Sequence, residues 1–260
     1  MSNKGFMLPN KLILRVDNVS AGYGKLQILH DVTISLCKGE IVSLIGRNGV
    51  GKSTLFNVIV GILRQWSGKI FLSDVDLARK SGNYIYKKGI SLMPQGSRIF
   101  PQLTVYENLV FNAKDKDIKR KNIGLKIERI FSENAPIIWE HCKKRILPKL
   151  DQNAGGLSGG ERQILSIIRI FINDSQVLLL DEPTNSLALP LIFELKNLMH
   201  ARTQNGSGIL FIEQKVIWAL NNCNRVYVMQ RGKIVHGGDP KPLIENEKIL
   251  SQYMGLTSPV

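Results

Sequence analysis

The chain of 260 residues has little of several features that would classify a protein at once. No apolar run reaches the ~18 residues that a membrane-spanning helix needs, so we expect no span. The N-terminal stretch MSNKGFMLPNKLILRV has no apolar centre, and we expect no secretory signal. At this length the chain can form one large domain with a sizeable core.

Cysteine and histidine are scarce and scattered along the chain. The cysteines show no metal-ligand spacing and indicate reduced thiols of a cytosolic protein, most of them packing residues. They are Cys37, Cys142 and Cys223. The histidines form no cluster in the sequence and receive no predicted role. They are His30, His141, His200 and His236.

Charge is strongly unbalanced, with a formal net charge of +14. Much of the excess lies between Lys114 and Lys149, where 11 Lys and Arg accompany 5 Asp and Glu. A solvated Lys-rich helical face explains this most simply, ahead of an anionic membrane surface. Nucleic acid comes last, because no DNA- or RNA-binding module accompanies the charge.

A phosphate-binding loop is present at residues 46–53, where GRNGVGKS matches G-x-x-x-x-G-K-[ST]. It follows the apolar run Ile41–Ile45, typical of a buried strand, and we expect a helix from near Gly51 through Ile62. Glycines let the backbone N–H groups face an anion, Lys52 should reach the β- and γ-phosphates, and the Ser53 hydroxyl should ligate Mg²⁺. The predicted nucleotide-binding residues of this loop are Gly46, Arg47, Asn48, Gly49, Gly51, Lys52, Ser53 and Thr54.

Two carboxylates follow a second apolar run, Val177–Leu180, which is typical of a core strand of a mostly parallel sheet. Asp181 would hold Mg²⁺, and Glu182 would orient and partly deprotonate an attacking water. An Asp-Glu pair after a strand is by itself an ordinary turn. The phosphate loop upstream favours the catalytic interpretation.

Between these motifs, residues 157–163 read LSGGERQ, hereafter the signature. Gly159 and Gly160 precede a predicted helix over Glu161–Phe171, with Ser158 as its N-cap. A plain capped helix explains the serine but not the Gly-Gly pair or its place shortly before the second carboxylate strand.

In this order the three motifs resemble the ATP-binding subunit of an ABC transporter, over residues from about Leu12 to about Asp239. The resemblance implies ATP and Mg²⁺ as cofactors, and implies that Ser158, Gly159 and Gly160 bind the γ-phosphate held by the opposite subunit. It also implies that the Tyr23 ring stacks on adenine, and that Gln95 meets Mg²⁺ and the attacking water.

At two positions the sequence departs from the residues usual in this family, and these departures narrow the resemblance to a subfamily. The loop after the carboxylates reads Asn185-Ser186-Leu187-Ala188, so Ala188 stands where an aspartate is usual. Gln214 stands where the family has a switch histidine; it can donate a hydrogen bond to a γ-phosphate but carries no charge. These features, with GRNGVGKST and PQGSRIFPQLTVYENL, are similar to subunits that power branched-chain amino acid uptake, or urea and short-amide uptake.

The implied fold is α/β, a P-loop NTPase (RecA-like) core with an N-terminal antiparallel portion and an inserted helical subdomain. We expect one domain over residues 1–260, with the nucleotide-binding core at about 12–102 and 154–239, the helical insert at about 103–153 and a tail at 240–260. The expected antiparallel strands are Leu12–Val19, Val32–Leu36 and Ile70–Leu72. The expected parallel strands are Ile41–Ile45, Ile90–Met93, Val177–Leu180 and Ile209–Ile212, followed by a hairpin of Arg225–Met229 and Lys233–Val235.

The resemblance further implies an ATPase motor of an importer, peripheral to the cytoplasmic face of the inner membrane. Its partners would be a second ABC ATPase subunit in a head-to-tail heterodimer, two transmembrane permease subunits and, indirectly, a periplasmic solute-binding protein. Two other hypotheses remain open. One is a nucleic-acid-associated ABC protein, and the other is a nucleotide-binding regulatory subunit with weak hydrolysis, which Gln214 and Ala188 favour.

Overall fold

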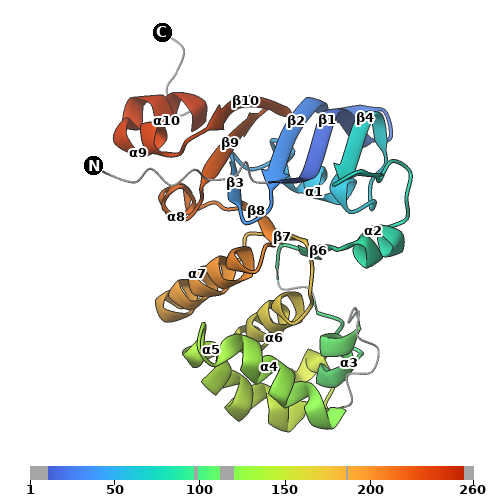
Figure 1. The fold of residues 1–260 in the computed structure, drawn as a ribbon, viewed down its shortest axis with the longest axis vertical. Coiled ribbons are helices and arrows are strands. Elements are labelled where there is room, and N and C mark those ends of the chain that lie inside the picture. The colour runs from blue at the N-terminus through green and yellow to red at the C-terminus, as the bar shows by residue number, and fades with distance from the viewer. Residues whose placement is uncertain (1–10, 97–98, 112–119, 186, 255–260) are drawn as a thin grey trace.

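The computed structural model describes residues 11–96, 99–111, 120–185 and 187–254. Ser186 of the loop after the carboxylates and residues 112–119 of the basic stretch lie outside the described residues. Two sheets lie in the upper part of Figure 1, and helices between α3 and α6 gather below them. Over the described ranges, no helix has both the length and the apolar character needed to cross a bilayer.

The larger sheet has six strands in the order β10-β9-β3-β8-β7-β6. All neighbours are parallel except the β9–β10 hairpin, as predicted for this fold class. The hairpin turns at Arg231 and Gly232, whose positive φ values of 44° and 76° suit a tight two-residue turn. The strands are β3 (Ile41–Ile45), β6 (Ile90–Met93), β7 (Val177–Asp181), β8 (Gly208–Ile212), β9 (Arg225–Gln230) and β10 (Lys233–Gly238).

The smaller sheet is antiparallel, with the order β2-β1-β4-β5. Its strands extend beyond the predicted ones, because backbone pairing continues past the alternating apolar residues: Gly22 pairs with Gln27 and Ala21 with Leu29. The strands are β1 (Leu12–Tyr23), β2 (Leu26–Cys37), β4 (Gln65–Leu72) and β5 (Val75–Asp76).

Helix α1 (Lys52–Ile59) follows the phosphate loop and is shorter than predicted. The prediction of a helix through Ile62 is wrong because Gly61 adopts a left-handed φ of 74°. The Gly61 N–H donates to the Val58 carbonyl at 3.1 Å, and the Ile62 N–H donates to the Asn57 carbonyl at 2.9 Å. This pair of bonds is the Schellman motif that closes a helix C-terminus.

The remaining helices lie after β5. The described residues of 105–111 and 120–149 are mostly helical: α3, then a 3₁₀ turn at Arg120–Asn122, α4 and α5, a π turn at Cys142–Ile146 and a 3₁₀ turn at Leu147–Lys149. The helix bounds are α2 (Gly82–Lys88), α3 (Val105–Val110), α4 (Ile123–Phe131), α5 (Pro136–His141), α6 (Gly159–Phe171), α7 (Leu189–Gln204), α8 (Val216–Asn221), α9 (Lys241–Glu245) and α10 (Glu247–Met254). Helix α6 starts two residues earlier than predicted.

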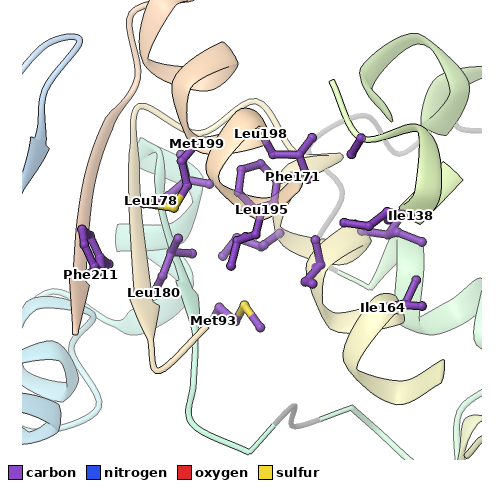
Figure 2. Close-up of a cluster of buried hydrophobic side chains, with 14 of the residues drawn as sticks. Met93, Ile138, Ile164, Phe171, Leu178, Leu180, Leu195, Leu198, Met199 and Phe211 are labelled. Carbon is purple, nitrogen blue, oxygen red and sulfur yellow. The ribbon is translucent and has the colours of Figure 1, made fainter. Parts of the chain in front are cut away.

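Hydrophobic cores cover both faces of the parallel sheet. Alternate residues of one strand face opposite ways, so Val177 and Leu179 join the core with α1 and the antiparallel sheet. Leu178 and Leu180 join the other core, which extends through α6 and α7 to Ile138 of α5 (Figure 2). The parallel sheet is thus packed on both faces, and these two layers hold the ends of its strands in place.

A buried carboxylate also joins α5 to α7. Glu194 of α7, only 5% exposed, accepts the backbone N–H groups of Ile137 and Ile138, each at 2.6 Å. The N-cap residue of α5, Ala135, has no side-chain hydrogen bond to the helix. Glu194 therefore supplies from another helix the acceptors that the first turn of α5 needs.

Candidate functional site

The phosphate loop between β3 and α1 has the curled backbone that its glycines predict. Gly46 has a φ of 151°, and a Cβ at this position would lie 2.3 Å from the Met229 carbonyl oxygen. Gly49 and Gly51 also have positive φ values, of 80° and 112°. The loop therefore packs against β9 so closely that a side chain at residue 46 has no room.

Lys52 lies inside this loop and is 7% exposed. Its Nζ donates to the carbonyl oxygens of Gly46 at 2.8 Å and Arg47 at 2.9 Å. Burial lowers the pKa of Lys52, and the negative charges of Glu182 and Asp181 partly offset that effect. The charges of Asp181, at the end of β7, and of Glu182, directly after it, thus act on the Lys52 ammonium.

Glu182 is the centre of the hydrogen-bond network. Its Oε2 accepts from Gln95 Nε2 at 2.8 Å, and its Oε1 accepts from Gln214 Nε2 at 2.6 Å. Asn185 Nδ2 also donates to Oε2, at a longer 3.5 Å. The backbone of Glu182 is left-handed, with a φ of 52°, which is strained for a residue with a side chain. Such strain is common where a side chain must be aimed precisely into a site.

A cavity of about 350 Å³ gathers the phosphate loop and this network. Asp181 is absent from its lining but lies on a second cavity of about 320 Å³, which Gly159, Gly160 and Glu182 also line. Glu182 therefore borders both cavities. The first cavity is lined by Ile28, Asn48, Gly49, Gly51, Lys52, Ser53, Thr54, Gln95, Glu182 and Gln214.

The signature occupies the start of α6, as predicted. Ser158 accepts the N–H of Glu161 at 3.3 Å, and Glu161 Oε2 accepts the N–H of Ser158 at 2.9 Å. This reciprocal pair is a capping box. Ser158, Gly159 and Gly160 are exposed, so the positive end of the helix faces outward.

Several predicted residues are not among those that line the first cavity: Tyr23, Gly46, Arg47, Ser158, Gly159, Gly160 and Asp181. Tyr23 ends β1 with 51% of its surface exposed and is not among the lining residues. Ala188 is the N-cap of α7 and makes no side-chain capping bond. The adenine-stacking role of Tyr23 stays a prediction, as do the chemical roles of the other site residues.

Several residues near the site were not predicted from the sequence. Glu213, which is 2% exposed, accepts the N–H of Thr184 at 2.9 Å and so holds the loop after Glu182. Burial raises the pKa of Glu213, although hydrogen bonds from Thr184 and Lys215 act against that rise. A signal was present, since Glu213 follows the buried strand β8 as Glu182 follows β7. Gln163 lies at the end of the signature but received no predicted role; its Nε2 donates to the Pro183 carbonyl at 3.3 Å.

The residues present suit Mg²⁺ better than a softer metal. Within the described part of the chain, no group of three or more His, Cys, Asp and Glu side chains could hold a metal. Ser53 and Gln95 offer neutral oxygens on the first cavity, and Asp181 offers a carboxylate on the second. Mg²⁺ is commonly held by one or two protein oxygens together with substrate phosphates, which this donor set fits.

Comparison with known proteins places this geometry in a family. Residues 29–185 match the family described as ABC transporter. The chain is 36% identical to the high-affinity branched-chain amino acid transport ATP-binding protein BraG of Pseudomonas aeruginosa, covering 94% of this chain and 100% of that protein. It is 30% identical to the lipopolysaccharide export system ATP-binding protein LptB of Haemophilus influenzae, covering 94% and 97%.

A third relative is the probable branched-chain amino acid transport ATP-binding protein LivF of Archaeoglobus fulgidus, at 32% identity over 94% of this chain and 99% of that protein. Among solved structures, a nucleotide-free ATP-binding cassette from an ABC transporter has a TM-score of 0.74 at 28% identity, covering 94% and 99%. The ADP conformation of an ATP-binding cassette of an ABC transporter has a TM-score of 0.72 at 28% identity, with the same coverage. This chain therefore belongs to the ABC transporter ATP-binding family and is a nucleotide-binding ATPase of that family.

Proposed function

We propose that this chain is the ATP-hydrolysing subunit of an importer for branched-chain amino acids. The observation that carries the ATPase chemistry is the pair of amides on Glu182, one from Gln95 and one from Gln214, beside the phosphate loop. The similarity to two branched-chain amino acid transport proteins supports the solute class. The LptB relatives are export proteins, so the direction of transport belongs to the proposal.

Glu182 acts as the base that orients and deprotonates the attacking water in this proposal. Each carboxylate oxygen can accept two hydrogen bonds, so Glu182 can hold the attacking water while it keeps both amides. Gln214 then supplies a neutral donor to the γ-phosphate, in place of an imidazole. Lys52, now bound to two loop carbonyls, turns to the β- and γ-phosphates.

Mg²⁺, when bound, would neutralise phosphate charge and polarise the bond that breaks. Ser53, Gln95 and Asp181 are the residues that would hold it. The exposed Tyr23 would stack on adenine, and the exposed turn Ser158–Gly160 would bind the γ-phosphate held by a second ATPase subunit. Permeases and a periplasmic solute-binding protein would complete the assembly, with this chain peripheral on the cytoplasmic face of the inner membrane.

An uptake assay tests the solute. In cells that lack the gene for this chain, the wild-type chain should restore uptake of labelled leucine, whereas Glu182→Gln should not. Labelled urea and a short amide, measured in parallel, test the alternative solutes. Leucine uptake that persists unchanged in the deletion strain would contradict the proposal.

A second assay tests the heterodimer. The isolated chain should hydrolyse ATP slowly, and addition of the second ATPase and the permeases should raise the rate well above the sum of the parts. Each composite site needs a signature from another subunit, and Gln214 leaves the site on this chain without a histidine. A stable, fully active homodimer of this chain would contradict the heterodimer.

A gel-shift measurement at physiological salt tests the nucleic-acid hypothesis. The proposed importer predicts no tight, sequence-selective complex with DNA or RNA, because the basic residues act at the membrane complex. A tight and specific complex would favour a nucleic-acid-associated ABC protein instead.

A further inference from the structure

The signature contains a carboxylate, Glu161, beside the turn where a phosphate is proposed to bind. Glu161 is the acidic residue in the first turn of α6. A negative charge there stabilises the helix N-terminus, but it also repels any second anion that approaches the same turn. If Ser158, Gly159 and Gly160 bind a phosphate, as the proposed function requires, the charge of Glu161 has to be neutralised.

Lys149 provides the opposite charge. Its Nζ donates to Glu161 Oε1 at 2.6 Å, while Oε2 of the same carboxylate accepts the N–H of Ser158. The side chains are only partly accessible, at 29% for Lys149 and 13% for Glu161. This contact is short and charge-assisted, and its two side chains are only partly accessible to water. It therefore differs from the usual fully exposed ion pair, which contributes little to stability.

The backbone that follows Lys149 is held in place. The Leu150 carbonyl accepts the N–H of Tyr106 at 3.0 Å, and the Gln152 carbonyl accepts the N–H of Val105 at 2.9 Å. Further along, the N–H of Gly155 donates to the Pro101 carbonyl at 3.0 Å. The stretch from Lys149 to the signature therefore runs along residues 101–106, and Lys149 approaches Glu161 from a fixed base.

The ionisation of Glu161 agrees with this geometry. Burial acts to raise the pKa of Glu161, but the ion pair with Lys149 and the hydrogen bond from Ser158 outweigh it. The pKa of the carboxyl lies below its ordinary value as a result. Glu161 is thus an anion at neutral pH, and the need for a neutralising cation is real.

We propose that Lys149 is a positioning residue for the signature, neutralising Glu161 and keeping that carboxylate turned away from a phosphate bound in trans by Ser158, Gly159 and Gly160. The inference rests on the proposed function, since it assigns a charge partner to the same site. Lys149 acts through Glu161 and contacts no phosphate itself.

The test is a double-substitution cycle in the complex of this chain with its second ATPase and permeases. Lys149→Met should lower the ATPase rate by roughly 3- to 30-fold, the range that one charge at a helix N-terminus produces. Lys149→Arg should retain most of the rate. The pair Lys149→Met with Glu161→Gln should recover most of the loss, because the unpaired carboxylate is then gone.

Two controls separate this role from a structural one. Arg15→Met removes a cation that pairs with Asp17 at 2.9 Å on the antiparallel sheet, outside the basic stretch, and it should leave the rate close to wild type. Binding of a fluorescent ATP analogue to the isolated full-length chain should be equal for all variants, because the phosphate loop is intact. Full rate in Lys149→Met, or no recovery in the double variant, would overturn the inference.

A further variant separates failure of the inference from failure of the proposed function. Gly160→Asp adds a negative charge to the signature, where a new Cβ meets no atom within 4 Å. If Gly160→Asp is inactive while Lys149→Met is normal, only the role of Lys149 is wrong. If Gly160→Asp is fully active, the signature does not bind phosphate, and both proposals fail.

Discussion

Around Glu182, side chains from distant parts of the chain converge, since Gln95 and Gln214 lie 87 and 32 residues away in sequence. At the start of α6, by contrast, Ser158 and Glu161 bond to each other, the Lys149 that also bonds to Glu161 is only 12 residues away, and the turn is exposed. The Glu182 side is assembled within the fold, whereas the signature side displays one preformed surface. In the proposed function, the Glu182 network completes one half of the chemistry within this chain, and the exposed signature is the half offered to a second subunit.

The largest expected effect comes from changing Glu182, the residue at the centre of the internal hydrogen-bond network. Glu182→Gln should leave ATP binding intact and slow turnover by about 10²- to 10⁴-fold, the scale for a lost general base. Steady-state ATPase of the assembled complex is the measurement, with binding of a fluorescent ATP analogue as the control. Near-normal turnover would remove Glu182 from the role of base.

Removal of the Lys52 ammonium from the phosphate loop should have the next largest effect. Lys52→Ala should weaken ATP binding by roughly 10- to 100-fold, because hydrogen bonds to charged groups contribute about 1.5–3 kcal/mol. Titration with a fluorescent ATP analogue measures the change. Lys69→Ala, at an exposed strand position, is the matched control and should bind normally. Unchanged affinity in Lys52→Ala would mean that this loop is not the nucleotide site.

A substitution of Gln214 tests the Glu182 network more finely. Gln214 replaces the histidine usual in the family, and it contacts Glu182 directly. Gln214→Ala should lower the ATPase rate of the complex by about 10-fold, the scale of one hydrogen bond to a charged group. Gln214→His should be tolerated, since an imidazole can also donate. A rate in Gln214→Ala equal to wild type would show that this amide has no part in turnover.

The histidine variant should also acquire a new pH dependence. An imidazole beside the Glu182 carboxylate should have a pKa above its ordinary value of about 6.5. Its ion pair with Glu182 would then be complete below that ordinary value and would be lost as pH rises through the raised one. Comparison of pH–rate profiles for wild type and Gln214→His measures this. Superimposable profiles would contradict the contact.

The smallest expected effect comes from a change in the exposed signature turn. Ser158→Ala removes a helix cap of about 1 kcal/mol and should lower the rate several-fold. Ser81→Ala is a close control, because Ser81 caps α2 through the same kind of bond, accepting from Tyr84 N–H at 3.3 Å. Both variants should lose similar stability on thermal unfolding. Equal losses of ATPase rate would mean that the signature serine is only a cap.

Much of the fold was predictable, because its signals are local. The expected runs Ile41–Ile45 and Ile90–Met93 coincide with β3 and β6, and Ser158 caps α6 as its neighbours suggest. The early end of α1 was also encoded locally, by Gly61, although the apolar residues up to Ile62 favoured a longer helix.

The contacts that assemble the site were not predictable in the same way. Motifs placed Gln95, Glu182 and Gln214 in one site, but no pattern in the sequence indicates that both amides would bind the two oxygens of one carboxylate. The Lys149–Glu161 pair and the role of Glu213 depend on how separate segments pack. Such contacts arise from tertiary geometry, which hydrophobic periodicity does not encode.

The carboxylate of Glu194 has a mechanical consequence. Its two hydrogen bonds fasten the first turn of α5 to α7, and α7 begins directly after the loop that carries Glu182 and Asn185. Any rotation of the helical segment that keeps these bonds must drag α7 along, and a rotation that leaves α7 still must expose a buried anion. Force applied at α5 is therefore passed directly to α7, the helix that follows the loop of Glu182, the proposed base.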